Sequence, residues 1–124
     1  MSTVNDFVMG WSEGNFERVL EACGDGVTFQ IPGKSTLAGK YTESDFVSHL
    51  SKKFTELSGG TYRFTAHDIL VSDLHATVLG TASIMKNGKK EEYRTVHVMR
   101  LDKGRPIAWY EYPRDLYAFD SLWT

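Results

Sequence analysis

The residue best suited to proton transfer is a histidine in the middle of an alternating segment. The segment TVHVMRL, residues 95–101, has strand periodicity, and the face that carries His97 also carries Thr95, Met99 and Leu101. A neutral imidazole can donate and accept a hydrogen bond, and free imidazole titrates near neutral pH. The sequence leaves two interpretations open. His97 faces a cavity and transfers protons, or it is a core histidine held by a neighbouring hydroxyl or backbone group.

A second histidine, His67, lies beside Asp68 in TAHDILV, where the apolar residues do not decide which of the two points inward. We take His67 as the second candidate for a cavity residue. No HxH, HExxH or CxxC spacing occurs in the chain, so we predict no metal site. No glycine-rich phosphate loop or GxSxG motif occurs either, so any chemistry is expected to be acid–base chemistry without a cofactor.

The composition indicates one domain, residues 1–124. The hydrophobic share of 41% and the charged share of 24% are ordinary for a globular protein, while 13% aromatic residues are many for so small a core. A net charge of −2 without a basic run argues against nucleic acid and against a membrane surface as partners. The single cysteine, Cys23, excludes an intrachain disulfide, and no apolar run has the length of a signal peptide or a membrane span. We expect a soluble, cytoplasmic protein in which Cys23 is a buried packing residue.

The elements that must position His97 follow from periodicity and capping residues. Apolar residues at helical spacing predict helices within residues 2–15, 15–24 and 42–60. A strand is predicted within 26–33, followed by a loop over 34–41. Period-two patterns then predict an antiparallel meander of strands within 61–71, 75–85, 91–101 and 106–112, before a helical turn within 115–123. This order predicts an α+β fold with one sheet face packed on the helices.

The order of elements, together with FQIPGKSTLAGKY and WYEYPRDLYAFDSLW, resembles the NTF2-like superfamily and, within it, the SnoaL-like branch that also holds ketosteroid isomerases. The resemblance covers nearly the whole chain. It implies a cone-shaped, cystatin-like fold in which a curved antiparallel sheet and three N-terminal helices surround a pocket, commonly in a homodimer. It implies no single reaction, because proteins of this fold include isomerases, cyclases, epoxide hydrolases, dehydratases and binding-only domains.

The resemblance also argues against the ketosteroid isomerase reaction. At the positions that match the tyrosine, the aspartate base and the oxyanion-binding aspartic acid of those enzymes, this chain has Phe7, Ile31 and His97. Phe7 cannot donate a hydrogen bond and Ile31 cannot accept a proton, so the standard ketosteroid isomerase mechanism is not expected. The same match implies that His97 points into the pocket.

The last predicted strand, PIAWYEY, would supply the partners of His97. Matched position by position with the pocket-facing polar residues of this strand in SnoaL-like relatives, the sequence has Tyr110 and Tyr112, which the resemblance implies as catalytic residues. A tyrosine hydroxyl can donate a hydrogen bond to a developing enolate oxygen. Glu111 would then face outward, unless a β-bulge shifts the register.

The expected pocket is largely apolar. The residues expected to bind substrate are Phe7, Trp11, Phe29, Phe54, His67, Tyr93, Thr95 and Met99. Gly80 and Ala82 are small and would leave room for a ligand. Such a chamber suits a flat, small apolar or aromatic molecule that carries carbonyl or phenol groups.

Two functions remain open. The first is a SnoaL-like enzyme that cyclises, isomerises or dehydrates a polyketide-like or terpenoid-like substrate, with His97 as proton shuttle and Tyr110 and Tyr112 as oxyanion donors. The second is a non-catalytic NTF2-like domain that binds a small apolar ligand or a protein partner. In either case we expect a homodimer, with Val96 and Val98 on the outward face of the sheet.

Overall fold

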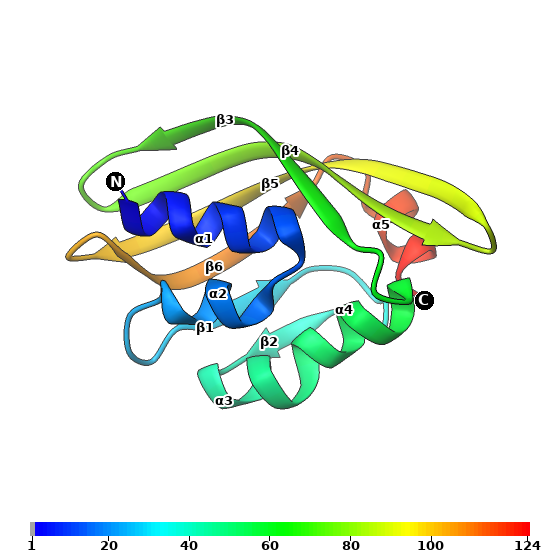
Figure 1. Ribbon diagram of the computed structural model, residues 1–124, viewed down its shortest axis with the longest axis horizontal. Coiled ribbons are helices and arrows are strands. Elements are labelled where there is room, and N and C mark those ends of the chain that lie inside the picture. The colour runs from blue at the N-terminus through cyan, green and yellow to red at the C-terminus, as the bar shows by residue number, and fades with distance from the viewer. Residues whose placement is uncertain (1) are drawn as a thin grey trace.

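The computed structural model describes residues 2–124 as helices packed on one curved sheet (Figure 1). The helices are α1 (Ser2–Glu13), α2 (Phe16–Glu21), α3 (Glu43–Asp45), the π-helical turn η1 (Phe46–Leu50), α4 (Ser51–Ser58) and α5 (Leu116–Leu122). The strands are β1 (Thr28–Ile31), β2 (Gly39–Tyr41), β3 (Arg63–Val71), β4 (His75–Lys86), β5 (Lys89–Asp102) and β6 (Arg105–Pro113). The α+β prediction is confirmed, and the short strand β2 replaces the end of the predicted loop.

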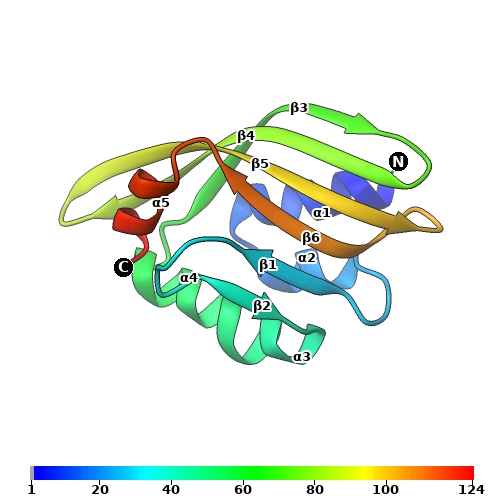
Figure 2. The same ribbon diagram turned by 180° about the vertical axis from the view of Figure 1, so that it is seen from behind.

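The six strands form one sheet in the order β2-β1-β6-β5-β4-β3. Neighbouring strands are antiparallel except for β1 and β6, which run parallel with Gln30 opposite Tyr110. The predicted antiparallel meander is therefore correct for β3 to β6, but the whole sheet is mixed. Helices α1 and α2 cover one face of this sheet, and from behind the strands lie in front of these helices (Figure 2).

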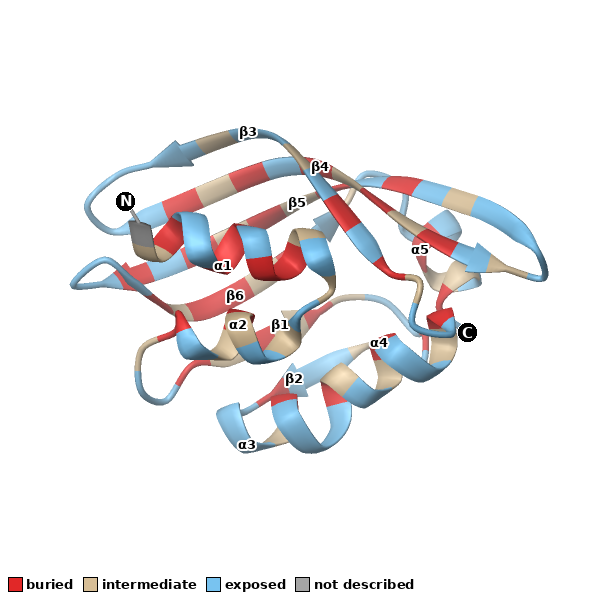
Figure 3. Ribbon diagram, in the orientation of Figure 1, coloured by how far each residue is buried: buried red, intermediate tan, exposed pale blue. Residues whose placement is uncertain are grey.

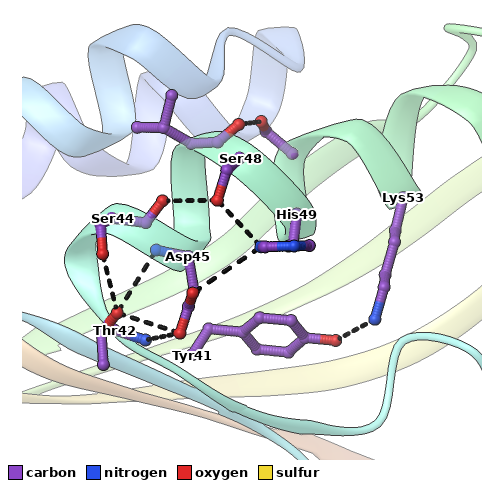
Figure 4. A network of polar contacts seen from close by, with 9 residues as sticks. Tyr41, Thr42, Ser44, Asp45, Ser48, His49 and Lys53 are labelled. Carbon is purple, nitrogen blue, oxygen red and sulfur yellow. Dashed lines mark hydrogen bonds and ion pairs between the residues drawn. The ribbon is translucent and has the colours of Figure 1, made fainter.

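Capping side chains start the helices close to the predicted positions. The side chain of Asn15 accepts a hydrogen bond of 3.1 Å from the backbone N–H of Arg18 at the start of α2. Thr42 and Asp45 form a capping box at the start of α3 (Figure 4). His49 lies 3.7 Å from the Asp45 carboxylate, and 63% of its side chain is exposed. This polar network faces solvent, as expected for the side of the helix opposite its apolar residues.

Two irregularities in the sheet decide which side chains face the helices. The pairing of β3 with β4 skips His67, and the pairing of β5 with β6 skips Ile107. Successive strand side chains point to opposite faces, so a skipped residue exchanges the faces for every residue beyond it. On β3 and on β6, the alternation that decides which side chains face the helices therefore shifts by one residue at the skipped position.

One apolar core lies between the helices and the sheet (Figure 3). It is unusually aromatic, and its fully buried rings are those of Trp11, Trp109, Trp123, Phe7, Phe29, Phe46, Phe54, Phe64 and Phe119. Burial of one such side chain contributes about 1.5–3 kcal/mol to the stability of the fold. The predicted burial of Cys23 is confirmed, and its thiol donates to the carbonyl oxygen of Val19 at 3.3 Å.

Helix α5 covers one end of this core. It starts at Asp115, whose carboxylate accepts a hydrogen bond of 3.1 Å from the backbone N–H of Ala118. Trp123 follows the helix and is fully buried. Its indole N–H donates to the Tyr93 hydroxyl at 3.1 Å, and Lys86 donates to the carbonyl oxygen of Leu122 at 2.9 Å. These contacts fix the end of the chain against the long hairpin of β4 and β5.

Candidate active site

Three polar side chains meet inside the core on two neighbouring strands. His97 on β5 lies opposite Glu111 on β6, and only 1% and 2% of their surfaces are exposed. Glu111 Oε2 lies 3.6 Å from His97 Nε2 and accepts a hydrogen bond of 2.8 Å from the Thr95 hydroxyl. Cross-strand partners share one face of a sheet, so both residues point toward the helices. The predicted inward orientation of His97 is confirmed, and its acidic neighbour is Glu111.

The predicted partners Tyr110 and Tyr112 lie on the other face of the sheet, so their predicted inward orientation is wrong. Tyr112 is 56% exposed and Tyr110 is partly exposed. A regular register from the pair Asp102–Arg105 would place Tyr110 opposite His97, but the β5–β6 pairing skips Ile107. Beyond the skipped position the two faces of β6 are exchanged, which turns Glu111 inward and the two tyrosines outward.

Aromatic rings surround the imidazole of His97. The Phe64 ring stacks on it with centroids 4.3 Å apart, and the indoles of Trp109 and Trp11 lie at 4.7 and 5.3 Å. Phe64 also fills the space beside Gly80, where an added Cβ would press against its ring and come within 2.6 Å of a backbone oxygen. The room that the sequence assigns to a ligand at Gly80 is therefore occupied by a side chain of β3.

Five buried polar atoms around this centre have no hydrogen-bond partner within residues 2–124. They are Trp11 Nε1, Tyr62 Oη, His97 Nε2, Trp109 Nε1 and Glu111 Oε1. An unpartnered buried polar atom costs on the order of 1–3 kcal/mol, and most buried polar atoms in proteins have partners. The core thus concentrates unused hydrogen-bonding capacity around His97 and Glu111, at a cost in stability.

Two buried tyrosines near Glu111 are held in their protonated form. Burial raises the pKa of Tyr62 well above its ordinary value near 10, and the negative charge of Glu111 raises it further. Burial and the charge of Glu111 likewise raise the pKa of Tyr93, although its hydrogen bond with Trp123 acts in the opposite direction. Both hydroxyls therefore remain hydrogen-bond donors throughout the neutral pH range.

Most residues predicted to bind substrate are buried in the core around this centre. These residues are Phe7, Trp11, Phe29, Phe54, Tyr93, Thr95 and Met99. The exception is His67, which is exposed, and its Nε2 lies 2.7 Å from the Thr81 hydroxyl on the outer face. The prediction that His67 faces a cavity inside the core is wrong because this residue is the skipped position of the β3–β4 pairing.

His67, Tyr110 and Tyr112, which are predicted to lie inside the core, line hollows on the outer face of the sheet. His67 and Tyr112 lie beside Arg94 and Arg114 around a hollow of about 480 Å³. Tyr110 and Tyr112 line a neighbouring hollow of about 230 Å³. The sheet separates these surface hollows from the His97 side chain, so the two tyrosines and His97 do not form one site.

Two residues of the centre, Glu111 and Tyr62, are missed by sequence reasoning. Glu111 can be found only when the skipped residue on β6 is known. Tyr62 immediately precedes β3 and lies two residues before Phe64, which is buried. Strand alternation from Phe64 gives Tyr62 the same inward face, so that signal is present in the sequence.

The arrangement is suited to moving a proton in apolar surroundings. Glu111 and His97 can accept and return a proton, while the N–H and O–H groups nearby can donate to an oxygen atom. No group of three or more His, Cys, Asp or Glu side chains that could hold a metal ion is found in the described part of the chain. None of the described helices has the length and apolarity needed to cross a membrane.

Comparison with known proteins gives the same fold. The sequence profile of the SnoaL-like domain matches residues 4–109. No curated protein matches the chain by sequence. A cystatin-like protein of unknown function from Xanthomonas campestris superposes with a TM-score of 0.85 at 19% identity, over 98% of this chain and 95% of that one. An NTF2-like protein of unknown function from Burkholderia pseudomallei gives 0.81 at 22%, over 100% and 96%. TerC, co-crystallized with polyporic acid, gives 0.84 at 18%, over 98% and 95%.

Proposed function

Because the chain belongs to the SnoaL-like domain family, which includes polyketide cyclases, we propose that it is a cofactor-independent acid–base enzyme. It cyclises, isomerises or dehydrates a small polyketide-like or terpenoid-like substrate. One observation carries the proposal: His97 Nε2 and Glu111 Oε2 lie 3.6 Å apart in the core, and Nε2 and Glu111 Oε1 have no partner within the described residues. An acid–base pair that is buried and has free proton-accepting atoms is suited to act on a bound molecule.

The proposed reaction begins with removal of a proton from a carbon atom next to a carbonyl group. Thr95 holds Oε2 of Glu111, which leaves Oε1 available as the proton acceptor. His97 Nε2 lies 3.6 Å from Oε2 of the same carboxylate and can take the proton over or return it at a second carbon. Electrostatic interactions are stronger in apolar surroundings than in water, and general acid–base catalysis typically contributes 10²–10⁴-fold in rate.

The character of the core supports a flat, mostly apolar substrate. The indoles of Trp11 and Trp109 stack at 4.8 Å, and Phe64 and Phe54 complete the aromatic surroundings. Polyporic acid in the co-crystals of TerC supports the choice of an aromatic, oxygen-bearing compound for this chain as well. Entry of such a compound requires these rings to move apart, because they pack directly against His97.

The proposal is tested with 2-tetralone, a flat ketone whose α-protons exchange with solvent through an enolate. We expect the protein to accelerate this exchange in D₂O, followed by NMR. His97→Gln and Glu111→Gln should each reduce the acceleration by 10²-fold or more. His75→Gln and Glu92→Gln change the same residue types at exposed positions, and they should leave the rate unchanged. Equal rates for the buried and the exposed variants would contradict the proposed base pair.

A second candidate function is ligand binding without chemistry. Phe64 packs directly on His97, with 4.3 Å between the ring centroids. This packing favours binding without chemistry, because the Phe64 ring occupies the space next to the imidazole where a reacting group would have to lie. In that case the protein binds 2-tetralone but leaves its α-proton exchange at the uncatalysed rate. Calorimetric binding and NMR exchange measured on the same sample therefore separate the two functions.

We also propose that the protein forms a homodimer through the outer face of β4 to β6. This face carries Leu79, 40% exposed, and Tyr112, 56% exposed, together with the partly exposed Val96 and Val98. A stable dimer buries about 800 Å² on each partner. Light scattering should give twice the chain mass of 14.0 kDa, and Leu79→Asp should lower it to the monomer value. A monomeric mass for the unaltered protein would contradict the dimer.

A further inference from the structure

The centre around His97 contains more unused hydrogen-bond donors than acceptors. Trp11 Nε1, Trp109 Nε1 and the Tyr62 hydroxyl are donors without partners among residues 2–124, while Glu111 Oε1 is an acceptor without one. His97 Nε2 can act in either way, depending on its tautomer. A molecule that satisfies this set must therefore offer acceptor oxygens to the donors and an acidic proton to Glu111.

The unpartnered atoms belong to side chains that lie side by side. The rings of Trp11 and Tyr62 lie 6.0 Å apart, those of Trp11 and Trp109 4.8 Å, and those of Trp109 and His97 4.7 Å. They come from α1, from the segment that precedes β3, and from β5 and β6. Four separate parts of the chain thus bring side chains with unpartnered polar atoms into one region of an apolar core.

Tyr62 differs from the buried Tyr41 and Tyr93 because its hydroxyl has no partner among residues 2–124. The hydroxyl of Tyr93 accepts from the Trp123 indole at 3.1 Å. The hydroxyl of Tyr41 donates to the carbonyl oxygen of Leu37 at 2.7 Å. Tyr62 is 3% exposed, so bulk water does not replace the missing protein partner. Selection for packing alone would favour phenylalanine here, because an unused buried hydroxyl destabilises the fold.

We propose that Tyr62 contacts the substrate and donates a hydrogen bond to the oxygen on which negative charge develops, with Trp11 and Trp109 as further donors. The substrate class is a flat aromatic or alicyclic compound with an enolisable carbonyl group and more acceptor oxygens than donors. This inference rests on the proposed function, since it takes Glu111 and His97 as the groups that receive the proton.

The step is balanced without any further reactant. The C–H bond next to the carbonyl breaks, its proton goes to Glu111 Oε1 or His97 Nε2, and its electron pair forms the new C=C bond. The π pair of the carbonyl group moves to the oxygen, which becomes an enolate held by the Tyr62 O–H. Tyr62 keeps its own proton, because burial raises its pKa well above 10. Return of the proton to the same or another carbon atom restores the protein groups.

The test compares 2-tetralone with tetralin, which has the same bicyclic skeleton without the oxygen. Calorimetry should give tighter binding of 2-tetralone to the unaltered protein. Tyr62→Phe should weaken 2-tetralone binding about tenfold and leave tetralin binding unchanged, because only one hydrogen bond to the oxygen is lost. Tyr41→Phe removes a buried hydroxyl that already has a partner, and it should keep the preference for 2-tetralone.

The inference is overturned if the unaltered protein does not prefer 2-tetralone, or if Tyr62→Phe keeps the full preference. If Tyr62→Phe does not fold, Trp109→Phe removes another donor of the same set, and it should reduce the preference as well. Loss of the proposed function has a different signature. If α-proton exchange is absent while the preference still depends on Tyr62, the assignment of Tyr62 as a ligand contact stands and the catalytic proposal fails.

Discussion

Replacement of Glu111 by glutamine should make the protein more stable, while it slows the proposed proton transfer by 10²-fold or more. Glu111 is 2% exposed, and its carboxylate receives one hydrogen bond within the described residues, from Thr95 at 2.8 Å. His97 Nε2 lies at 3.6 Å, beyond hydrogen-bond distance, and Oε1 has no partner among those residues. A carboxylate in this position has lost most of its hydration without full compensation.

The size of the effect follows from these contacts. Dehydration of a buried ion costs several kcal/mol, whereas one hydrogen bond to a charged group returns about 1.5–3 kcal/mol. Glutamine has nearly the same volume and can keep the bond from the Thr95 hydroxyl, worth about 1 kcal/mol to a neutral acceptor. We therefore expect Glu111→Gln to raise the free energy of unfolding by about 1–3 kcal/mol. For 124 residues this corresponds to roughly 4–12 °C in Tm.

Urea unfolding and calorimetry at pH 8, where carboxyl groups of the unfolded chain are ionised, measure the change. Glu92→Gln is the matched control, because Glu92 lies on the same strand as His97 with 55% of its side chain exposed, 3.5 Å from Lys90. It should change stability by less than about 0.5 kcal/mol. A lower Tm for Glu111→Gln would refute the reasoning, since it would mean that the carboxylate is a net stabilising partner of His97.

Four further results are expected. Tyr93→Phe should lower the free energy of unfolding in urea by about 1–3 kcal/mol, because the buried indole N–H of Trp123 loses its acceptor. Burial raises the pKa of Tyr93, so the contribution of this side chain to stability is present below pH 10 and declines above it. Between pH 9 and 11, the Tm of Tyr93→Phe should therefore fall less than the Tm of the unaltered protein. Gly80→Ala should destabilise by about 1–3 kcal/mol, measured by calorimetry, because its Cβ would press against Phe64, and an unchanged Tm would contradict that packing. Burial raises the pKa of Cys23 to about 12, so its thiol should react with an aromatic disulfide reagent at pH 8 only after unfolding.

Local signals in the sequence account for most of the fold. The cap at Asn15 and the turn at Asn87-Gly88, where both residues have positive φ, are determined by the chemistry of adjacent residues. The inward row of β5 follows from simple alternation, so Thr95 and His97 are predicted correctly. Strand β2 is not predictable in this way, because its three residues become a strand only by pairing with β1.

The error in the candidate site has one physical source. A regular hairpin that closes at Asp102 and Arg105 would place Tyr110 opposite His97, whereas the residue skipped on β6 places Glu111 there. A β-bulge depends on packing across the sheet more than on the identity of the skipped residue. Counting along the strand therefore cannot decide which face of β6 carries the acid.

The parallel pairing of β1 with β6 also has a consequence for how the protein folds. The hairpin of β5 and β6 is local, so His97 and Glu111 can come together early, while both are still hydrated. Closure of β1 on β6 joins segments separated by most of the chain, and contacts of such long sequence separation form slowly. We therefore expect water to leave the acid–base pair late in folding. Glu111→Gln should accordingly act mainly on the unfolding rate and leave the refolding rate almost unaltered.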